Sequence, residues 1–182
     1  MSDHFSTEST TKLLDTFVFG VERRTVRHGD ATFARDVVTH PGGVAVLAFN
    51  DGGEIGVIRQ WRAPFETYLW EIPAGTQDVA HEAPLATAQR ELAEEMGATA
   101  SEWRLLGRFM VSPGWTDQVM TIFEARNLTM VERRPEGPEE TSASTHWFSP
   151  SDLRDRLRAE PAIDATMTIA LHRAFGTFFD ER

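Results

Sequence analysis

The stretch RELAEEMG at residues 90–97 crowds three carboxylates, Glu91, Glu94 and Glu95, into little more than one helical turn. At 100° per residue, a helix places Glu95 about 40° and Glu94 about 60° from Glu91, so the three share one face. Like charges one turn apart repel each other, and the negative end of the helix dipole disfavours them further. A hard divalent cation would offset both penalties, because it prefers carboxylate oxygens. The spacing therefore indicates a metal site, and a solvated acidic face is the alternative interpretation.

Residues near this stretch extend the predicted metal site. Arg90 lies one turn before Glu94 and can pair with it. In PAGTQDVAHE (73–82), the Pro-Ala-Gly break can turn the Ala74 carbonyl toward the same cations, and Glu82 comes just before the helix. The sequence thus predicts a cage formed by Glu82, the Ala74 carbonyl and the three helix glutamates, while a cap at the start of the helix is the alternative role for Glu82.

The composition narrows the classes of function. The 182 residues carry a net charge of −10 and include no cysteine. Disulfides, thiolate metal sites and a cysteine nucleophile are therefore excluded. The arginines are scattered rather than arranged in a basic stripe, which argues against nucleic acid as a partner. If the substrate is an anion, metal cations would be needed between it and the carboxylates of this acidic protein. The N-terminus does not resemble a signal peptide and no apolar run is long enough to span a membrane, so we expect a cytoplasmic protein without a membrane partner.

The elements that must position these residues are predicted from their patterns. Strands are expected at 42–49, 53–61, 68–75, 104–111 and 117–126 and in the STHWF segment, and a short antiparallel element at 17–38. The carboxylate helix should span 84–96 and end at Gly97, with Leu85, Ala88, Leu92 and Met96 facing the core. A serine-capped helix and a final helix with Asp164 as N-cap should follow. Residues 1–10 read as a frayed end and 133–144 as a polar loop, and the whole indicates an α+β protein.

The segment GTQDVAHEAPLATAQRELAEEMGA (75–98) resembles the Nudix box, G-x5-E-x7-R-E-U-x-E-E-x-G-U, where U is apolar. The spacing agrees from Glu82 through Arg90, Glu91, Glu94 and Glu95 to the end of the motif. One departure is visible, since six residues rather than five separate Gly75 from Glu82. The extra residue falls in the loop before the helix and leaves the helical spacing intact.

The resemblance extends to one group within the Nudix hydrolases, the ADP-ribose pyrophosphatases, from about residue 12 onward. It is carried by VIRQWRAP, WEIPAG, SPGWTDQ (112–118) and AIDATMTIAL. It implies the Nudix fold, an α/β/α sandwich with a mixed central sheet, together with a small N-terminal antiparallel β element. Residues 1–40 would then serve dimerisation and substrate binding, residues 41–182 would form the Nudix hydrolase domain, and the protein would be a homodimer.

The activity that the resemblance implies is Mg²⁺-dependent hydrolysis of the pyrophosphate of ADP-ribose to AMP and ribose 5-phosphate, with Mn²⁺ as the alternative cofactor. Glu91 and Glu95 would be the main metal ligands, with Glu94 and the Ala74 carbonyl completing the set, and Arg90 would orient a carboxylate. In such enzymes a glutamate on a late mobile loop acts as general base. The loop PEGPEET offers Glu140 first and Glu139 second, besides Glu136, although each could be an ordinary solvated charge.

Substrate contacts follow from the same resemblance. Arg62 would bind the diphosphate or ribose, or else form a surface salt bridge. Trp61, with Trp70, Trp115 and Phe19, is a candidate for stacking on adenine, although large aromatics more often pack in the core. Pro113, Gly114 and Asp117 belong to the SPGWTDQ segment, and Gln118 stands where the group usually has glutamate.

Two other functions stay open at this level. The residues of the box would bind only the diphosphate, which several compounds share. The substrate could therefore also be a nucleotide sugar, NADH or a flavin dinucleotide. A Nudix-fold module that senses a nucleotide without cleaving it is the alternative of another class.

Overall fold

A computed structural model describes residues 4–179 of the chain. The chain forms two compact units. One is built from the N-terminal segment up to Gly42 together with Met110–Val119, and the other from Gly43–Phe109 together with the segment from Met120 onward. None of the helices within residues 4–179 is long and apolar enough to cross a membrane.

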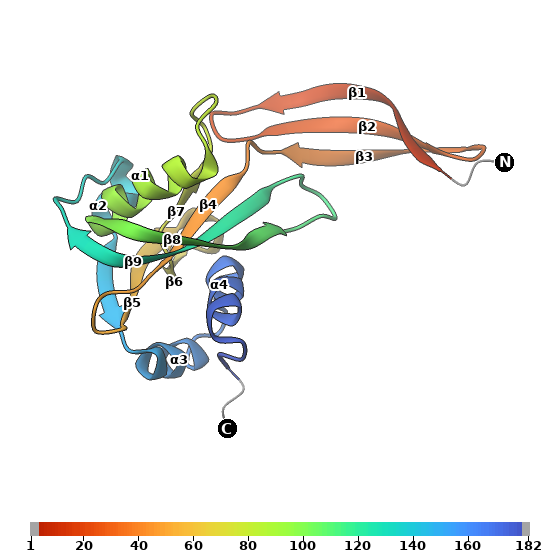
Figure 1. Ribbon diagram of the computed structural model, residues 1–182. Helices are drawn as coiled ribbons and strands as arrows, with labels where there is room; N and C mark the ends of the chain where they lie inside the picture. Colours follow the sequence, from red (N-terminus) through yellow and green to blue (C-terminus); the bar gives the residue numbers. More distant parts are fainter. Residues whose placement is uncertain (1–3, 180–182) are drawn as a thin grey trace. The chain divides into compact units, whose positions relative to one another are not determined.

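The first unit contains an antiparallel sheet in the order β1-β2-β3 (Figure 1), with β1 at Phe5–Asp15, β2 at Gly20–His28 and β3 at Ala31–Thr39. The expected antiparallel element is present. The expectation of a frayed end is wrong from Phe5 onward, and residues 1–3 lie outside the described residues. The Phe5 ring stacks on His28 with 4.0 Å between centroids, and the threonine-rich segment suits a strand because β-branched residues favour extended backbone.

The second unit holds two sheets. The mixed sheet has the order β7-β4-β9-β8, in which β4 (Gly43–Ala48) runs parallel to β9 (Val119–Met130) and antiparallel to β7 (Ala74–Thr76), with β8 (Ala98–Met110) at the far edge. The second sheet is antiparallel in the order β10-β5-β6, from Ser144–Phe148, Ile55–Arg62 and Thr67–Glu71. The predicted α+β class with a mixed sheet is confirmed.

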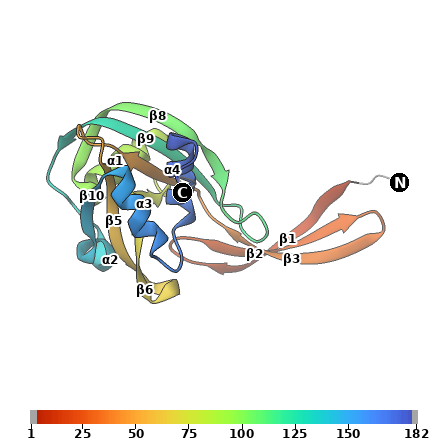
Figure 2. The ribbon, with the colours of Figure 1, turned by 90° about the horizontal axis from the view of Figure 1, so that it is seen from below.

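Helices cover both sides of this unit (Figures 1 and 2). Helix α1 (Pro84–Met96) packs against β4, β5 and β7, whereas α4 (Ala165–Phe175) packs against β4. One core cluster joins Val44 and Val46 of β4 to Leu92 of α1. Just beyond β4, Phe49 meets Phe175 of α4 edge to face, with 5.9 Å between centroids. Because β4 is buried throughout, its sequence GVAVLA is continuously apolar.

Capping residues in the sequence correctly predicted the end of α1 and the starts of two later helices. Helix α1 ends where Gly97 takes the left-handed conformation, with φ of 63°, and its N–H caps the Leu92 and Ala93 carbonyls. The Ser149 hydroxyl accepts from the Asp152 N–H at the start of α3 (Pro150–Arg158), and the Asp164 carboxylate accepts from the Met167 N–H at the start of α4.

Three sequence-based expectations about the second unit are wrong. Residues 133–144 are not a plain loop, because α2 (Gly137–Ser142) forms there with Pro138 in its first turn, where proline is tolerated. The single strand expected at 68–75 is divided into β6 and β7 around Pro73, and a short 3₁₀ turn (Ala63–Phe65) precedes β6. Leu85 lies in the first turn of α1 and is 37% exposed, while Ala88, Leu92 and Met96 are buried as predicted.

Candidate active site

The site begins with the contact between Gly75 on β7 and Glu91 on α1. A Cβ atom added to Gly75 would lie 2.0 Å from both Cδ and Oε1 of Glu91. The missing side chain at Gly75 is therefore what allows this carboxylate to rest directly on the β7 backbone. Glu91 is only 6% exposed.

Glu95 is the more deeply buried carboxylate, at 3% exposed. Its Oε2 accepts a hydrogen bond of 2.8 Å from the Ala74 N–H. Burial raises the pKa of Glu95 to about 8 against the opposing effect of that hydrogen bond. Burial likewise raises the pKa of Glu91 to about 7, although the neighbouring Arg90 charge opposes the rise. Two carboxylates thus lie side by side where their charges are costly.

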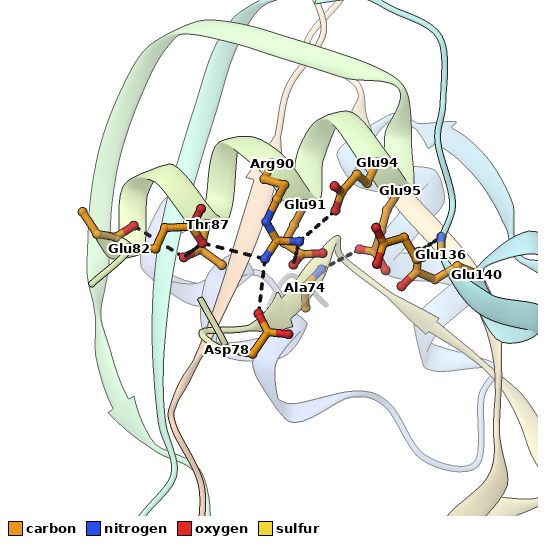
Figure 3. A network of polar contacts seen from close by, with 11 residues as sticks. Ala74, Asp78, Glu82, Thr87, Arg90, Glu91, Glu94, Glu95, Glu136 and Glu140 are labelled. Carbon is orange, nitrogen blue, oxygen red and sulfur yellow. Dashed lines mark hydrogen bonds and ion pairs between the residues drawn. The ribbon is translucent and has the colours of Figure 1, made fainter. Parts of the chain in front are cut away.

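Arg90 connects the carboxylates (Figure 3). Its Nη1 lies 2.9 Å from Glu91 Oε1 and 2.9 Å from Glu94 Oε2, and its Nη2 lies 3.8 Å from Glu82 Oε2 and 3.7 Å from Asp78 Oδ1. The expected pairing with Glu94 is present. The contact with Asp78, which lies in the loop carrying the extra residue, was not foreseen.

The donor set fits a hard divalent cation, because buried carboxylate oxygens and backbone carbonyls are the ligands that such ions prefer. Within residues 4–179, no three Asp, Glu or His side chains converge as a preformed cage. Arg90 holds Glu91 and Glu94, and the Ala74 N–H holds Glu95. The structure brings Ala74, Glu91, Glu94 and Glu95 into one region, and their role as metal ligands stays a prediction.

Glu82 has a structural partner close by. Its Oε2 accepts a hydrogen bond of 2.8 Å from the hydroxyl of Thr87, which is fully buried in α1. Ala83, the residue at the N-cap of α1, offers no side-chain cap. Glu82 therefore ties the loop before the helix to its first turns, while Arg90 links it at longer range to the other carboxylates.

The two candidate base residues lie on α2. The half-buried Glu140 lies beside Glu95 in Figure 3, and its negative charge contributes to the raised pKa values of Glu91 and Glu95. Its Oε2 accepts a hydrogen bond of 2.6 Å from the Glu136 N–H. Glu139 is exposed, and its charge acts on Arg62 instead. Of the two, Glu140 is the one whose charge reaches the buried pair.

Comparison with known proteins identifies the family of this chain. The NUDIX domain model matches residues 39–168, most of the chain. The chain belongs to the Nudix family. An ADP-ribose pyrophosphatase of Mycobacterium tuberculosis (strain ATCC 25618 / H37Rv) is 37% identical over 163 residues, which make up 88% of this chain and 79% of that protein. An ADP-ribose pyrophosphatase of Bacillus subtilis (strain 168) is 35% identical over 160 residues, which make up 88% of this chain and 84% of that protein.

A solved structure supports the Nudix fold. The crystal structure of an ADP compounds hydrolase superposes with a TM-score of 0.81 over 93% of this chain and 91% of that one, at 20% identity. The predicted family, its likeness to ADP-ribose pyrophosphatases and the prediction of a Nudix hydrolase are confirmed. Nudix enzymes in general use a divalent metal, which agrees with the donor set around Glu91 and Glu95.

Beyond the Nudix box, Arg62 has a buried acidic partner. Its Nε and Nη2 donate to the two carboxylate oxygens of Glu71, at 2.8 and 2.6 Å. Asp164 lies near this pair, and burial raises its pKa to about 6. Glu71 was not among the residues predicted from the sequence, and Asp164 was predicted only as a helix cap. A signal was present, because Glu71 is a carboxylate in the otherwise apolar WEIP segment.

The aromatic candidates on the β5–β6 sheet lie apart from Arg62. Trp61 and Arg62 are consecutive on β5, so their side chains point to opposite faces. Trp70 is buried, with Arg59 and Arg156 over its ring at 4.9 and 5.1 Å from the centroid. The structure therefore places Trp70 in a packed arginine–aromatic cluster.

The remaining substrate candidates, Pro113, Gly114 and Asp117, belong to the first unit. Pro113 and Gly114 are exposed. The Asp117 carboxylate accepts a hydrogen bond of 2.9 Å from the His40 N–H and lies 3.5 Å from Arg24 Nη2. Asp117 thus helps to join this segment to the end of β3 within that unit.

Proposed function

We propose that this Nudix hydrolase cleaves the pyrophosphate of ADP-ribose, giving AMP and ribose 5-phosphate, with Mg²⁺ as its cofactor. The observation that carries the proposal is the buried pair Glu91 and Glu95, set over Gly75 and the Ala74 N–H in the box segment. Two relatives named ADP-ribose pyrophosphatase support the choice of substrate, because each aligns with 88% of the chain.

Glu91, Glu94, Glu95 and the Ala74 carbonyl are the groups proposed to hold the cations. When bound, Mg²⁺ supplies positive charge that neutralises the diphosphate and polarises the phosphorus under attack. Arg90 keeps Glu91 and Glu94 in fixed positions through its 2.9 Å contacts. Glu82 supports the same network from the loop before α1.

Glu140 is the proposed general base, with Glu139 as the second choice. It lies beside the buried pair, and within residues 4–179 its carboxylate is held by a main-chain N–H rather than by an arginine. Helix α2 is short and contains no buried residue, which suits a group that must approach the substrate and withdraw from it. In this role Glu140 takes the proton of the attacking water.

Arg62 is the proposed diphosphate or ribose contact, because the Glu71 carboxylate fixes its guanidinium in one orientation. Trp61, Pro113, Gly114 and Asp117 remain proposed substrate contacts by likeness to the group. A homodimer in which residues 1–40 contribute to the interface, a cytoplasmic location and a domain running from 41 to 182 remain predictions.

The test is a substrate panel in Mg²⁺ and in Mn²⁺, with products separated by chromatography. We expect ADP-ribose to have the highest kcat/KM, above nucleotide sugars, NADH and flavin dinucleotides. Fast turnover of one of those compounds and slow turnover of ADP-ribose would overturn the choice of substrate. Binding of ADP-ribose without turnover would indicate a sensing module.

The variant Glu95→Gln tests the metal ligands in the same assay. It keeps the size of the side chain and an oxygen for the Ala74 N–H but removes the negative charge. We expect kcat/KM to fall by about 10³-fold or more, on the scale of losing a charge that stabilises the transition state. Unchanged metal-dependent hydrolysis would show that Glu95 is not a ligand.

A further inference from the structure

Helix α2 carries Glu139 and Glu140 but contains no buried residue of its own. Its C-terminal end is instead held by a side chain from outside the helix. Arg133 donates from Nη2 to the Glu140 carbonyl at 2.7 Å and from Nη1 to the Ala143 carbonyl at 3.0 Å. The Glu140 carbonyl also accepts the Ala143 N–H, at 3.1 Å. Carbonyls at a helix end carry partial negative charge, so a guanidinium suits both.

The main chain around Arg133 is fixed on the end of α1. The Val131 N–H donates to the Gly97 carbonyl at 2.8 Å, and the Arg134 N–H donates to the Glu94 carbonyl at 3.2 Å. The contact is close, since a Cβ atom at Gly97 would lie 2.8 Å from the Val131 carbonyl oxygen and 3.3 Å from the Arg133 Cβ. Arg133 therefore bridges the end of α1 and the end of α2.

Two different groups, the Arg133 guanidinium and the Glu136 N–H, bind two different parts of Glu140. Arg133 holds the main-chain carbonyl of Glu140, whereas its carboxylate accepts, among the residues that the structure describes, the Glu136 N–H at 2.6 Å. The backbone of Glu140 is thus anchored by Arg133, while its carboxylate has a separate partner in the Glu136 N–H. Glu140 lies on the side of α2 that faces Glu95 (Figure 3).

We propose that Arg133 is a positioning residue, which sets the distance between Glu140 and the carboxylates of α1 by binding the Glu140 and Ala143 carbonyls. The inference rests on the proposed function in one respect, that Glu140 acts as the base. Losing this anchor would let α2 move away from α1 without altering Glu91, Glu94 or Glu95. Catalysis should therefore suffer while binding of cation and substrate is kept.

The test compares Arg133→Met with Arg133→Lys and with Arg108→Met, which changes an exposed arginine on β8. It uses whichever dinucleotide the substrate panel shows to be hydrolysed fastest. We expect Arg133→Met to lower kcat about 10- to 100-fold, the scale of a misplacement of about 1 Å. KM and the half-saturating Mg²⁺ concentration should change less than about threefold. Arg133→Lys should recover part of kcat, and Arg108→Met should match the wild type.

A double-mutant cycle distinguishes positioning from a general loss of structure. In a Glu140→Gln background, Arg133→Met should produce no further fall in kcat, because the group that it positions has been removed. An equal fall in both backgrounds would overturn the proposal.

Hydrogen exchange tests the anchor without any enzyme activity. We expect amides of residues 137–143 to exchange at least about tenfold faster in Arg133→Met than in the wild type, since opening of α2 would cost less. Unchanged exchange would overturn the proposal even if ADP-ribose proves to be the wrong substrate. Conversely, a protein that hydrolyses none of the panel but shows faster exchange would refute the proposed function alone.

Discussion

The contact between Gly75 and Glu91 gives the sharpest prediction, through the substitution Gly75→Ala. The new methyl group would lie 2.0 Å from Glu91 Cδ and Oε1, and an ordinary contact begins at 3.4 Å. The carboxylate must therefore retreat by about 1.4 Å, and its 2.9 Å contact with Arg90 Nη1 must change as well. Gly75 does not have a positive φ, so alanine fits the backbone of β7.

A displacement of this size at a metal ligand should cost about 10²-fold in kcat/KM, equivalent to about 2.7 kcal/mol. The assay is steady-state hydrolysis of ADP-ribose over a range of Mg²⁺ concentrations, and the half-saturating Mg²⁺ concentration should rise. In a Glu91→Gln background the same substitution should cost much less, because the charged ligand is already absent.

Two results would refute this reasoning. Wild-type kcat/KM and Mg²⁺ dependence in Gly75→Ala would mean that the position of the Glu91 carboxylate over β7 is irrelevant to catalysis. A full loss in both backgrounds would mean that alanine damages β7 itself. Circular dichroism and the thermal midpoint of unfolding check that the variant is folded.

Two further predictions concern protons. Burial raises the pKa of Asp164 to about 6, so between about pH 4 and pH 6 the folded protein keeps a proton that the unfolded chain releases, and the free energy of unfolding should fall as pH rises, by about 3 kcal/mol in all. Asp164→Asn keeps a good helix cap but removes the titrating group, so its free energy of unfolding, measured by urea titration, should fall less between pH 4 and pH 6 than that of the wild type. The same dependence on pH in both proteins would contradict the prediction. Glu91 and Glu95, with pKa values of about 7 and 8, must lose protons before a cation binds, so the rise in melting temperature on adding Mg²⁺ should be larger at pH 8.5 than at pH 6. A rise independent of pH would argue against their role as ligands.

Local chemistry made α1 and its ends predictable. The pattern of Ala88, Leu92 and Met96 gave the buried edge, and Gly97 gave the end of the helix, because a left-handed residue is cheapest for glycine. The serine and aspartate caps of α3 and α4 were readable for the same reason. The Nudix box was readable because all its helical residues lie within a few turns.

Features that depend on distant partners were not predictable. The strand at Phe5–Asp15 is polar, so its sequence pattern does not predict a strand. It is stabilised by hydrogen bonds to β2, with which it pairs. Helix α2 is anchored by Arg133 from outside, so the PEGPEET sequence alone reads as a loop. Glu71 was not linked to Arg62, because their contact is made between two strands and Glu71 stands opposite Ile58 rather than Arg62 in the register. Leu85 was misplaced because a helical pattern cannot tell where the opposing surface ends.

The parallel pairing of β4 with β9 also bears on how the protein folds. Gly43 pairs with Met120, 77 positions later, and the whole Nudix box lies in the chain between them. Helix α1 packs in one cluster with Val46 of β4 and Phe123 of β9, so its apolar face is incomplete until β9 has docked. Closing so long a loop is entropically costly and slows folding. A nascent chain that ends before β9 would carry every glutamate of the box and still lack the sheet that seats them.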